Sequence, residues 1–300
     1  MACGRWIMHP VDPTIARPSG SRIGYACRLA GLFSVAFLPY ISSAGNTLHS
    51  NYSCTQPVYL TFDTGHMGVA DLIADVLRQE NVRVTFFGAH EKTQHGDGSL
   101  GEFWAPWWRA RASEGHAFAS HTYDHTYWRA DLTAASDGHG IRFRVRPSSG
   151  PKAGQEFVLS GAAYCAEIKR ADDRLRQLTG TDPLPLWRAP GGKTSTALLK
   201  NARACGYAHV GWSAAGFLGD ELPSAQYPNQ QLLNKALRDI KPGDILMAHL
   251  GIWSRQDPWA PAVLQPLLQG LKAKGFCFRT LAEHPTYAAW MASPASNKTR

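Results

Sequence analysis

A carboxylate and two closely spaced histidines stand out among the polar residues of this 300-residue chain. The carboxylate, Asp63, lies in a Thr-Phe-Asp-Thr-Gly-His segment, and His121 and His125 bracket a His-Thr-Tyr-Asp-His segment. Imidazole nitrogens bind zinc and related divalent ions, and such an ion activates water whose proton a carboxylate can take. These residue types therefore indicate a metal-dependent hydrolase.

The spacing of the two histidines is compatible with more than one backbone. Histidines four residues apart would share one face of a helix. The glutamate of the helical His-Glu-x-x-His motif is missing between His121 and His125, however, and residues 116–121 predict a strand. We therefore expect the pair at a strand end.

Short apolar runs alternate along the chain with segments whose apolar residues recur every three or four positions. The predicted strands are residues 58–63, 82–88, 116–121, 184–188, 207–212, 244–249 and 276–281. The predicted helices are residues 68–80, 103–114, 160–179, 195–205, 229–240 and 260–274. Repeated strand and helix require parallel strands with crossover connections, so we expect an α/β barrel or an open doubly wound sheet.

Five polar or aromatic residues each end a predicted strand: Asp63, His121, Arg188, Trp212 and His249. In an α/β barrel the carboxyl ends of all strands meet at one face, where active sites of such barrels lie. We therefore expect these five side chains to converge although they are far apart in the sequence.

One polar, glycine-rich segment, residues 126–160, interrupts this alternation. Within it residues 141–146 alternate with period two, which would place three arginines on one face of a strand. A turn would join this strand to residues 156–159, giving an inserted hairpin. It would be either a solvated edge hairpin or a basic flap over a substrate.

The N-terminus predicts an export signal. Basic residues precede an apolar run at 29–41, and small residues follow, so cleavage after Ala44 is expected. The run is shorter than the roughly 20 residues of a membrane span, and an uncleaved signal anchor stays open. We divide the rest into a linker at 45–56, a catalytic domain at 57–285 and a C-terminal tail at 286–300.

Composition and cysteine usage agree with one exported domain. With 44% hydrophobic residues, the chain can bury one large core, and its net charge of +8 comes without a basic helix that would suggest nucleic acid. Removal of residues 1–44 leaves Cys54, Cys165, Cys205 and Cys277, which an oxidising compartment could pair. The pairing, and whether these are instead buried free thiols, stays open.

Five segments, in this order along residues 57–285, resemble the polysaccharide deacetylase family, also called the NodB homology or carbohydrate esterase family 4 group. They are Thr-Phe-Asp-Thr-Gly at 61–65, His-Thr-Tyr-Asp-His at 121–125, Arg-Ala-Pro-Gly-Gly at 188–192, a segment centred on Trp212, and Ile-Leu-Met-Ala-His at 245–249. The resemblance implies a distorted (β/α)7 barrel, in agreement with the strand count, as a single catalytic domain with an inserted hairpin.

The resemblance also implies roles. His121 and His125 would be metal ligands, and Asp63 would be the general base that takes a proton from the attacking water. His249 would be the general acid that protonates the leaving nitrogen. Arg188 would pair with the base and keep it ionised by lowering its pKa.

Other positions would surround the acetyl group. Following Pro190, which fixes the turn, the backbone N–H of Gly191 would help to hold the oxyanion. Trp212 and Leu246 would form a small apolar pocket for the acetyl methyl.

This sequence departs from the family pattern at Thr64, where the family has a second aspartate that completes a His-His-Asp metal site. A neutral hydroxyl is a poor substitute. Water could fill the place, or His66, Asp63 or Asp124 could approach the ion. The fourth segment is also changed, and Asp220 is the nearest carboxylate that could tune the acid.

We therefore expect a metal-dependent hydrolase that removes N-acetyl groups from an N-acetylglucosamine-type polysaccharide and acts outside the cytoplasm. Its cofactor would be a divalent metal, zinc first, with cobalt or nickel as alternatives. We expect a monomer with an acetylated polysaccharide as partner, no nucleic acid, and membrane contact only through an uncleaved N-terminal segment. The alternatives are a carbohydrate-binding protein that has lost metal binding through Thr64 and an amidohydrolase acting on a small molecule.

Overall fold

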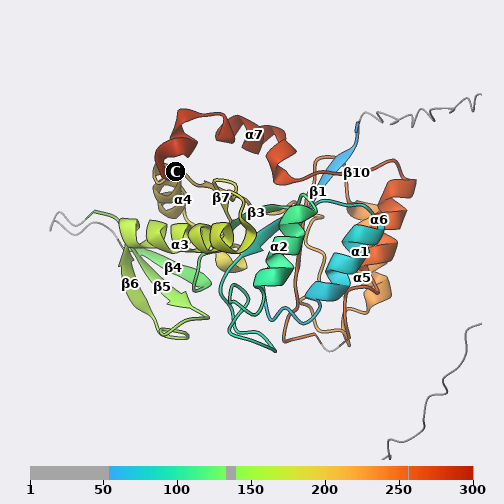
Figure 1. The fold of residues 1–300 in the computed structure, drawn as a ribbon, viewed down its shortest axis with the longest axis horizontal. Helices are drawn as coiled ribbons and strands as arrows, with labels where there is room; N and C mark the ends of the chain where they lie inside the picture. The colour runs from blue at the N-terminus through green and yellow to red at the C-terminus, as the bar shows by residue number, and fades with distance from the viewer. Residues whose placement is uncertain (1–53, 133–139, 256, 300) are drawn as a thin grey trace, which may run out of the picture. The chain divides into compact units, whose positions relative to one another are not determined.

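Seven parallel strands form the centre of the computed structural model, which describes residues 54–132, 140–255 and 257–299 (Figure 1). The strands are β1 (Pro57–Asp63), β2 (Thr85–Gly88), β3 (Ala117–Ser120), β7 (Leu186–Trp187), β8 (Ala208–His209), β9 (Ile245–His249) and β10 (Cys277–Phe278). Each falls within or overlaps one of the seven predicted strands, so the predicted α/β class and the strand count are confirmed. The signal segment 1–44 and most of the linker lie outside the described residues.

The sheet closes into a distorted barrel because β9 pairs with β1 on one side and with the segment after β8 on the other. Strand β1 has three neighbours. It pairs with β10 at its start and with β2 and β9 further along. From β2 the order continues through β3 and β7 to β8. Residues 213–218 then run beside β9, where the Phe217–Met247 bridge joins them, so a connecting segment fills the position after β8.

Six predicted helices connect these strands, and a seventh follows them. They are α1 (Ala70–Gln79), α2 (Ala105–Ser113), α3 (Gly161–Thr179), α4 (Thr196–Ala204), α5 (Asn229–Asp239), α6 (Leu264–Ala273) and α7 (Pro285–Met291). None of the helices that the structure describes is long and apolar enough to cross a membrane.

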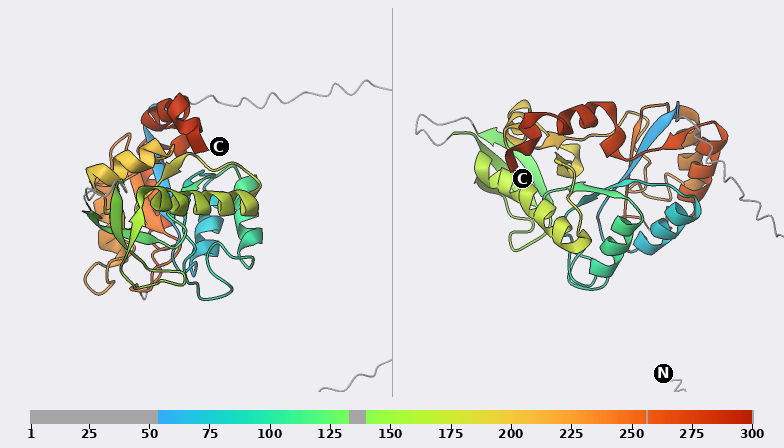
Figure 2. Two further views of the ribbon diagram at one scale, coloured as in Figure 1. Left: turned by 90° about the vertical axis from the view of Figure 1, so that its left-hand side faces the viewer. Right: turned by 45° about the horizontal axis from the view of Figure 1, so that its top comes forward.

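Helix α7 lies in the segment for which the sequence predicted only a tail. Its Trp290 belongs to a buried cluster with inward-facing strand residues such as Leu186, and donates a hydrogen bond to the carbonyl of Pro185, which precedes β7. Helix α7 therefore covers the end of the barrel away from the strand ends that carry Asp63 and His249 (Figure 2).

The inserted segment forms a three-stranded antiparallel sheet of β4 (Thr126–Leu132), β5 (Arg142–Pro147) and β6 (Phe157–Ser160). The predicted hairpin is thus present, with one more strand than expected. Phe143 and Val145 on β5 are buried with Tyr164 and Ile168 of α3, while Arg144 on the same strand is exposed. The small sheet lies beside α3, away from α1, α5 and α6 (Figure 1).

Two disulfides tie distant parts of the domain together. Cys54, before β1, bonds to Cys277 of β10, and Cys165 of α3 bonds to Cys205 at the end of α4. Each closes a long loop, with sequence separations of 223 and 40 residues. Cross-links of this kind stabilise a domain chiefly by restricting the unfolded chain.

We expect digestion without reductant to give cross-linked peptides containing the Cys54–Cys277 and Cys165–Cys205 bonds. Reduction should lower the free energy of unfolding by about 2–4 kcal/mol for each bond, measured by denaturant titration with and without reductant. A peptide that joins Cys205 to Cys277 would contradict this connectivity.

Candidate active site

Neighbouring strand ends bring four sequence-distant residues together. Asp63 ends β1 and lies opposite His249, which ends the adjacent strand β9. His121 directly follows β3, and Arg188 directly follows β7, which pairs with β3. Because parallel strands share one direction, these ends open on one face of the barrel, and the predicted convergence is confirmed for these four residues. Trp212, also predicted to end a strand, instead lies three residues beyond β8 and lines the same cavity.

A cavity of about 230 Å³ lies at this face. The predicted residues that line it are Asp63, His121, His125, Gly191, Trp212 and His249. The predicted arginine, Arg188, lies fully buried next to them, with its guanidinium against Asp63. One cavity therefore carries the predicted carboxylate and three histidines from three parts of the chain.

The structure places Leu246 in the core instead of the acetyl pocket. Alternate residues of a strand face opposite sides, so Leu246 packs in the main buried cluster while its neighbour Met247 lines the cavity. The apolar residue of β9 that could contact an acetyl methyl is thus Met247, one position from the predicted residue.

Gly191 lies in a short 3-10 helix, Pro190–Gly192, at the cavity wall. Its φ of 61° is a left-handed conformation that glycine adopts most readily. A Cβ at this position would also meet the ring of Tyr127 at 2.8 Å. Glycine is therefore the residue that lets the backbone approach the cavity here, while Pro190 is buried behind it.

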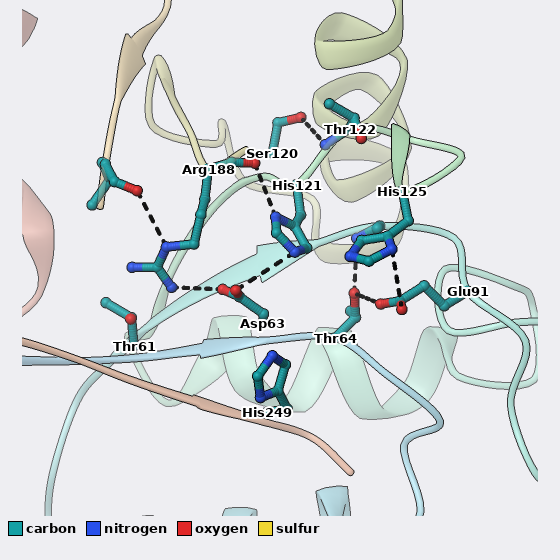
Figure 3. A network of polar contacts seen from close by, with 12 residues as sticks. Thr61, Asp63, Thr64, Glu91, Ser120, His121, Thr122, His125, Arg188 and His249 are labelled. Atoms are coloured by element: carbon teal, nitrogen blue, oxygen red, sulfur yellow. Dashed lines mark hydrogen bonds and ion pairs between the residues drawn. The ribbon is translucent and has the colours of Figure 1, made fainter. Parts of the chain in front are cut away.

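The carboxylate of Asp63 is almost fully buried, and each of its oxygens has a polar partner (Figure 3). Arg188 Nη1 donates to Oδ1 at 2.6 Å, and His121 Nε2 lies 3.5 Å from Oδ2. Burial alone raises the pKa of Asp63, but the guanidinium and nearby imidazoles outweigh it and hold the pKa below its usual value. Asp63 is therefore ionised at neutral pH.

The ring of His121 is neutral and keeps one nitrogen free to bind a metal ion. Its Nδ1 lies 2.9 Å from the backbone carbonyl of Arg188. A carbonyl only accepts, so Nδ1 carries the hydrogen and Nε2 keeps its lone pair toward the cavity. Burial lowers the pKa of His121 to about 4, which keeps the ring neutral at pH 7.

His125 follows His121 in a turn and not on a helix. Thr122 and His125 both have positive φ, and the backbone N–H of His125 bonds back to the Thr122 carbonyl. The two rings consequently lie next to each other, with centroids 4.8 Å apart and planes tilted by 59° (Figure 3). The Nδ1 of His125 lies 2.5 Å from the hydroxyl of Ser148, contributed by the inserted segment.

Thr64 is fully buried, and its hydroxyl already has two protein partners. It donates to Glu91 Oε2 at 2.6 Å and accepts from the backbone N–H of Ala89 at 3.0 Å. Glu91 also approaches His125, with its Oε1 3.8 Å from Nδ1 (Figure 3). A carboxylate thus stands beside the position where the sequence has lost one.

His249 is oriented by Asp220 through two contacts. The backbone N–H of His249 donates to Asp220 Oδ2 at 2.7 Å, and Nδ1 lies 3.1 Å from the same oxygen. Burial alone lowers the pKa of His249, but the carboxylates of Asp220, Asp63 and Glu221 outweigh it and raise the pKa to about 9. His249 is therefore protonated at neutral pH.

Two of the residues considered as replacement ligands lie elsewhere. His66 accepts a hydrogen bond from the backbone N–H of Gly68 and lines a different cavity. Asp124 faces α3, where it pairs with Arg170 at 3.4 Å. Of the acidic residues weighed from the sequence, only Asp63 reaches the cavity of the two histidines.

Several cavity residues were not identified from the sequence: Glu91, Tyr127, Ser148, Glu221 and Met247. Glu91 lies in the loop three residues beyond the end of β2, so the strand-end argument used for Asp63 does not reach it. Tyr127 and Ser148 show that the inserted sheet forms one wall of the cavity, which agrees with the flap interpretation. Contact of its arginines with substrate remains a prediction.

The donor types on this wall fit a divalent metal ion. The cavity is lined by the imidazoles of His121 and His125 and by the carboxylates of Asp63 and Glu91. The hydrogen of His121 is fixed on Nδ1, so Nε2 is free to bind an ion. Among residues 54–132, 140–255 and 257–299, as their side chains lie, no three His, Cys, Asp or Glu are grouped closely enough to hold an ion. His121 and His125 would be the nitrogen ligands.

Solved structures share this fold at low sequence identity. A family 4 acetyl xylan esterase from Clostridium thermocellum, solved with a cobalt ion, superposes with a TM-score of 0.56 at 20% identity. The match covers 78% of this chain and 92% of the esterase. This likeness supports the fold, a distorted barrel of parallel strands.

Sequence comparisons extend the match to two curated relatives. The chitooligosaccharide deacetylase of Azorhizobium caulinodans is 25% identical over 236 residues, which is 75% of this chain and 92% of the relative. The peptidoglycan-N-acetylglucosamine deacetylase of Bacillus cereus is 26% identical over 227 residues, with 75% and 86% covered. The family model described as polysaccharide deacetylase matches residues 51–210, more than half of the chain, and the chain therefore belongs to the polysaccharide deacetylase family.

Proposed function

We propose that this protein is a metal-dependent deacetylase that removes N-acetyl groups from an N-acetylglucosamine-type polysaccharide. The observation that carries the proposal is a pair of oppositely tuned groups on one cavity. Asp63 is kept ionised by Arg188, and His249 is kept protonated by Asp220. A base and an acid in these states are what amide hydrolysis needs at neutral pH.

In this mechanism Asp63 takes a proton from a water molecule while the oxygen of that water attacks the acetyl carbonyl carbon. His249 then gives its proton to the amide nitrogen as the carbon–nitrogen bond breaks, releasing acetate and a free amine. The N–H of Gly191 would donate to the developing oxyanion. Trp212 and Met247 would enclose the methyl group.

The family is metal-dependent, and we propose zinc, with cobalt or nickel as substitutes. When bound by His121 and His125, a divalent metal would supply Lewis acidity toward the carbonyl and lower the pKa of water. Asp63 and His249 would still carry out both proton transfers.

We also propose export, with the substrate met outside the cytoplasm. The two disulfides support this, since such bonds persist mainly in oxidising compartments. The peptide map proposed above also checks this point. Free thiols in protein isolated from its native host would contradict export.

The decisive assay measures acetate released from N-acetylglucosamine oligomers by the full chain, with and without a chelator. We expect release that the chelator abolishes and added zinc restores. A folded protein that binds the oligomer but releases no acetate would favour a carbohydrate-binding function. Release from N-acetylglucosamine alone, and not from oligomers, would favour a small-molecule amidohydrolase.

Replacement of the base tests its role separately from metal binding. Asp63→Asn should lower kcat by about 10²–10⁴-fold, because proton transfer to a positioned base contributes this much. Zinc content, measured by mass spectrometry, should stay unchanged. Asp173→Asn, the same change on the exposed side of α3, is the matched control and should retain full activity. Normal turnover by Asp63→Asn would remove Asp63 from the mechanism.

The pH profile tests the pairing of His249 with Asp220. His249 can donate a proton only below its pKa, so activity should fall as pH rises through about 9. Removing the carboxylate in Asp220→Asn should move this alkaline limb toward 6.5, the ordinary pKa of histidine. An alkaline limb that stays in place in Asp220→Asn would show that Asp220 does not control the acid.

A further inference from the structure

Glu91 stands where a carboxylate is needed and where the family motif no longer supplies one. Both backbone polar groups of Glu91 bond to Ser99. The Glu91 N–H donates to the Ser99 hydroxyl at 2.8 Å, and the Glu91 carbonyl accepts from the Ser99 N–H at 2.9 Å. Because this loop is anchored just beyond the end of β2, the side chain of Glu91 is directed to the cavity that His121 and His125 line.

The carboxylate of Glu91 lies between Thr64 and His125. One oxygen accepts the Thr64 hydroxyl at 2.6 Å, and the other lies 3.8 Å from His125 Nδ1 (Figure 3). Its side chain is 17% exposed, so it is largely removed from water yet reaches the cavity. A carboxylate that is largely removed from solvent is normally held near a positive charge.

Thr64 is better placed to hold this carboxylate than to replace it. Its hydroxyl hydrogen is committed to Glu91, and its oxygen accepts the N–H of Ala89. Ligand carboxylates are commonly fixed by such hydrogen bonds from neighbouring residues. The exchange of aspartate for threonine at position 64 thus moves the carboxylate to a different strand end.

We propose that Glu91 is the carboxylate ligand of the metal ion, together with His121 and His125, and that Thr64 is the residue that positions it. Because no three such side chains of the described residues are close enough to hold an ion as they lie, the His125 and Glu91 side chains would turn toward the ion as it binds. The inference rests on the proposed function only in assuming a divalent metal at this cavity. The ligand is a divalent cation of the zinc, cobalt or nickel type.

The test measures metal binding and not turnover. The full chain is stripped with chelator and titrated with Zn²⁺ by calorimetry. Glu91→Gln should weaken binding by more than about 100-fold, beyond the 10–100-fold typical of an outer hydrogen-bond partner. The matched control is Glu221→Gln, which removes the same charge from the other side of the same cavity and should bind as the native chain does. Native-like Zn²⁺ affinity in Glu91→Gln, or an equal loss in Glu221→Gln, overturns the proposal.

A second variant restores a carboxylate at position 64, where the family has its second aspartate. Thr64→Asp combined with Glu91→Gln should regain Zn²⁺ affinity to within about tenfold of the native affinity. About tenfold is the smallest loss of metal affinity usually seen when a hydrogen-bond partner of a ligand is removed. Thermal unfolding of the stripped proteins shows whether each variant is folded. A folded double variant that binds Zn²⁺ no better than Glu91→Gln would overturn the assignment. The assignment would also be overturned if Thr64→Val lost Zn²⁺ binding while Glu91→Gln kept it.

The visible spectrum of bound Co²⁺ gives an independent readout. We expect it to change in Glu91→Gln and to keep its native shape in Glu221→Gln, because only a change of ligand alters the coordination. An unchanged spectrum in Glu91→Gln overturns the proposal. If all variants behave as expected but the native chain releases no acetate, the proposed function fails while the ligand assignment stands.

Discussion

Arg188 reaches from the end of β7 to Asp63 at the end of β1, and neither side chain is more than 4% exposed. Removing one partner of such a buried pair typically costs about 3–5 kcal/mol, because an uncompensated charge remains. The guanidinium is fixed further by the carbonyls of Val210 and Gly211 and by the ring of Phe87. The carboxylate is thus ionised and aimed before any substrate arrives, which is the preorganisation that catalysis by electrostatics requires.

The same arginine also sets the state of the neighbouring histidine. Its backbone carbonyl accepts from His121 Nδ1 while its side chain pairs with Asp63, so one residue fixes both the proposed base and a proposed metal ligand. On the opposite side, Asp220 holds His249 in its protonated form. The cavity therefore holds an ionised carboxylate and a protonated imidazole, each with its own buried partner.

Around this centre, loops and the inserted sheet complete the wall. Ser148 contacts His125, Tyr127 packs against Gly191, and Glu91 accepts from Thr64. Loops carry much of the specificity of barrel enzymes because the strands beneath them are already fixed by packing. In this chain a loop also places the carboxylate of Glu91 beside Thr64, the position of the family's second aspartate.

The sequence by itself determined the seven parallel strands and the strand ends that carry Asp63, His121, Arg188 and His249. Apolar periodicity is a local property, and the alternation of strands with helices requires parallel strands. Tertiary structure alone decided the two disulfide pairs, the packing of Trp290 beneath the barrel, and the choice of Met247 over Leu246 at the cavity. It also decided the place of Glu91, which depends on Ser99 and Thr64. These contacts join residues from different loops and strands, and a single sequence records only which residues are present, not which of them meet.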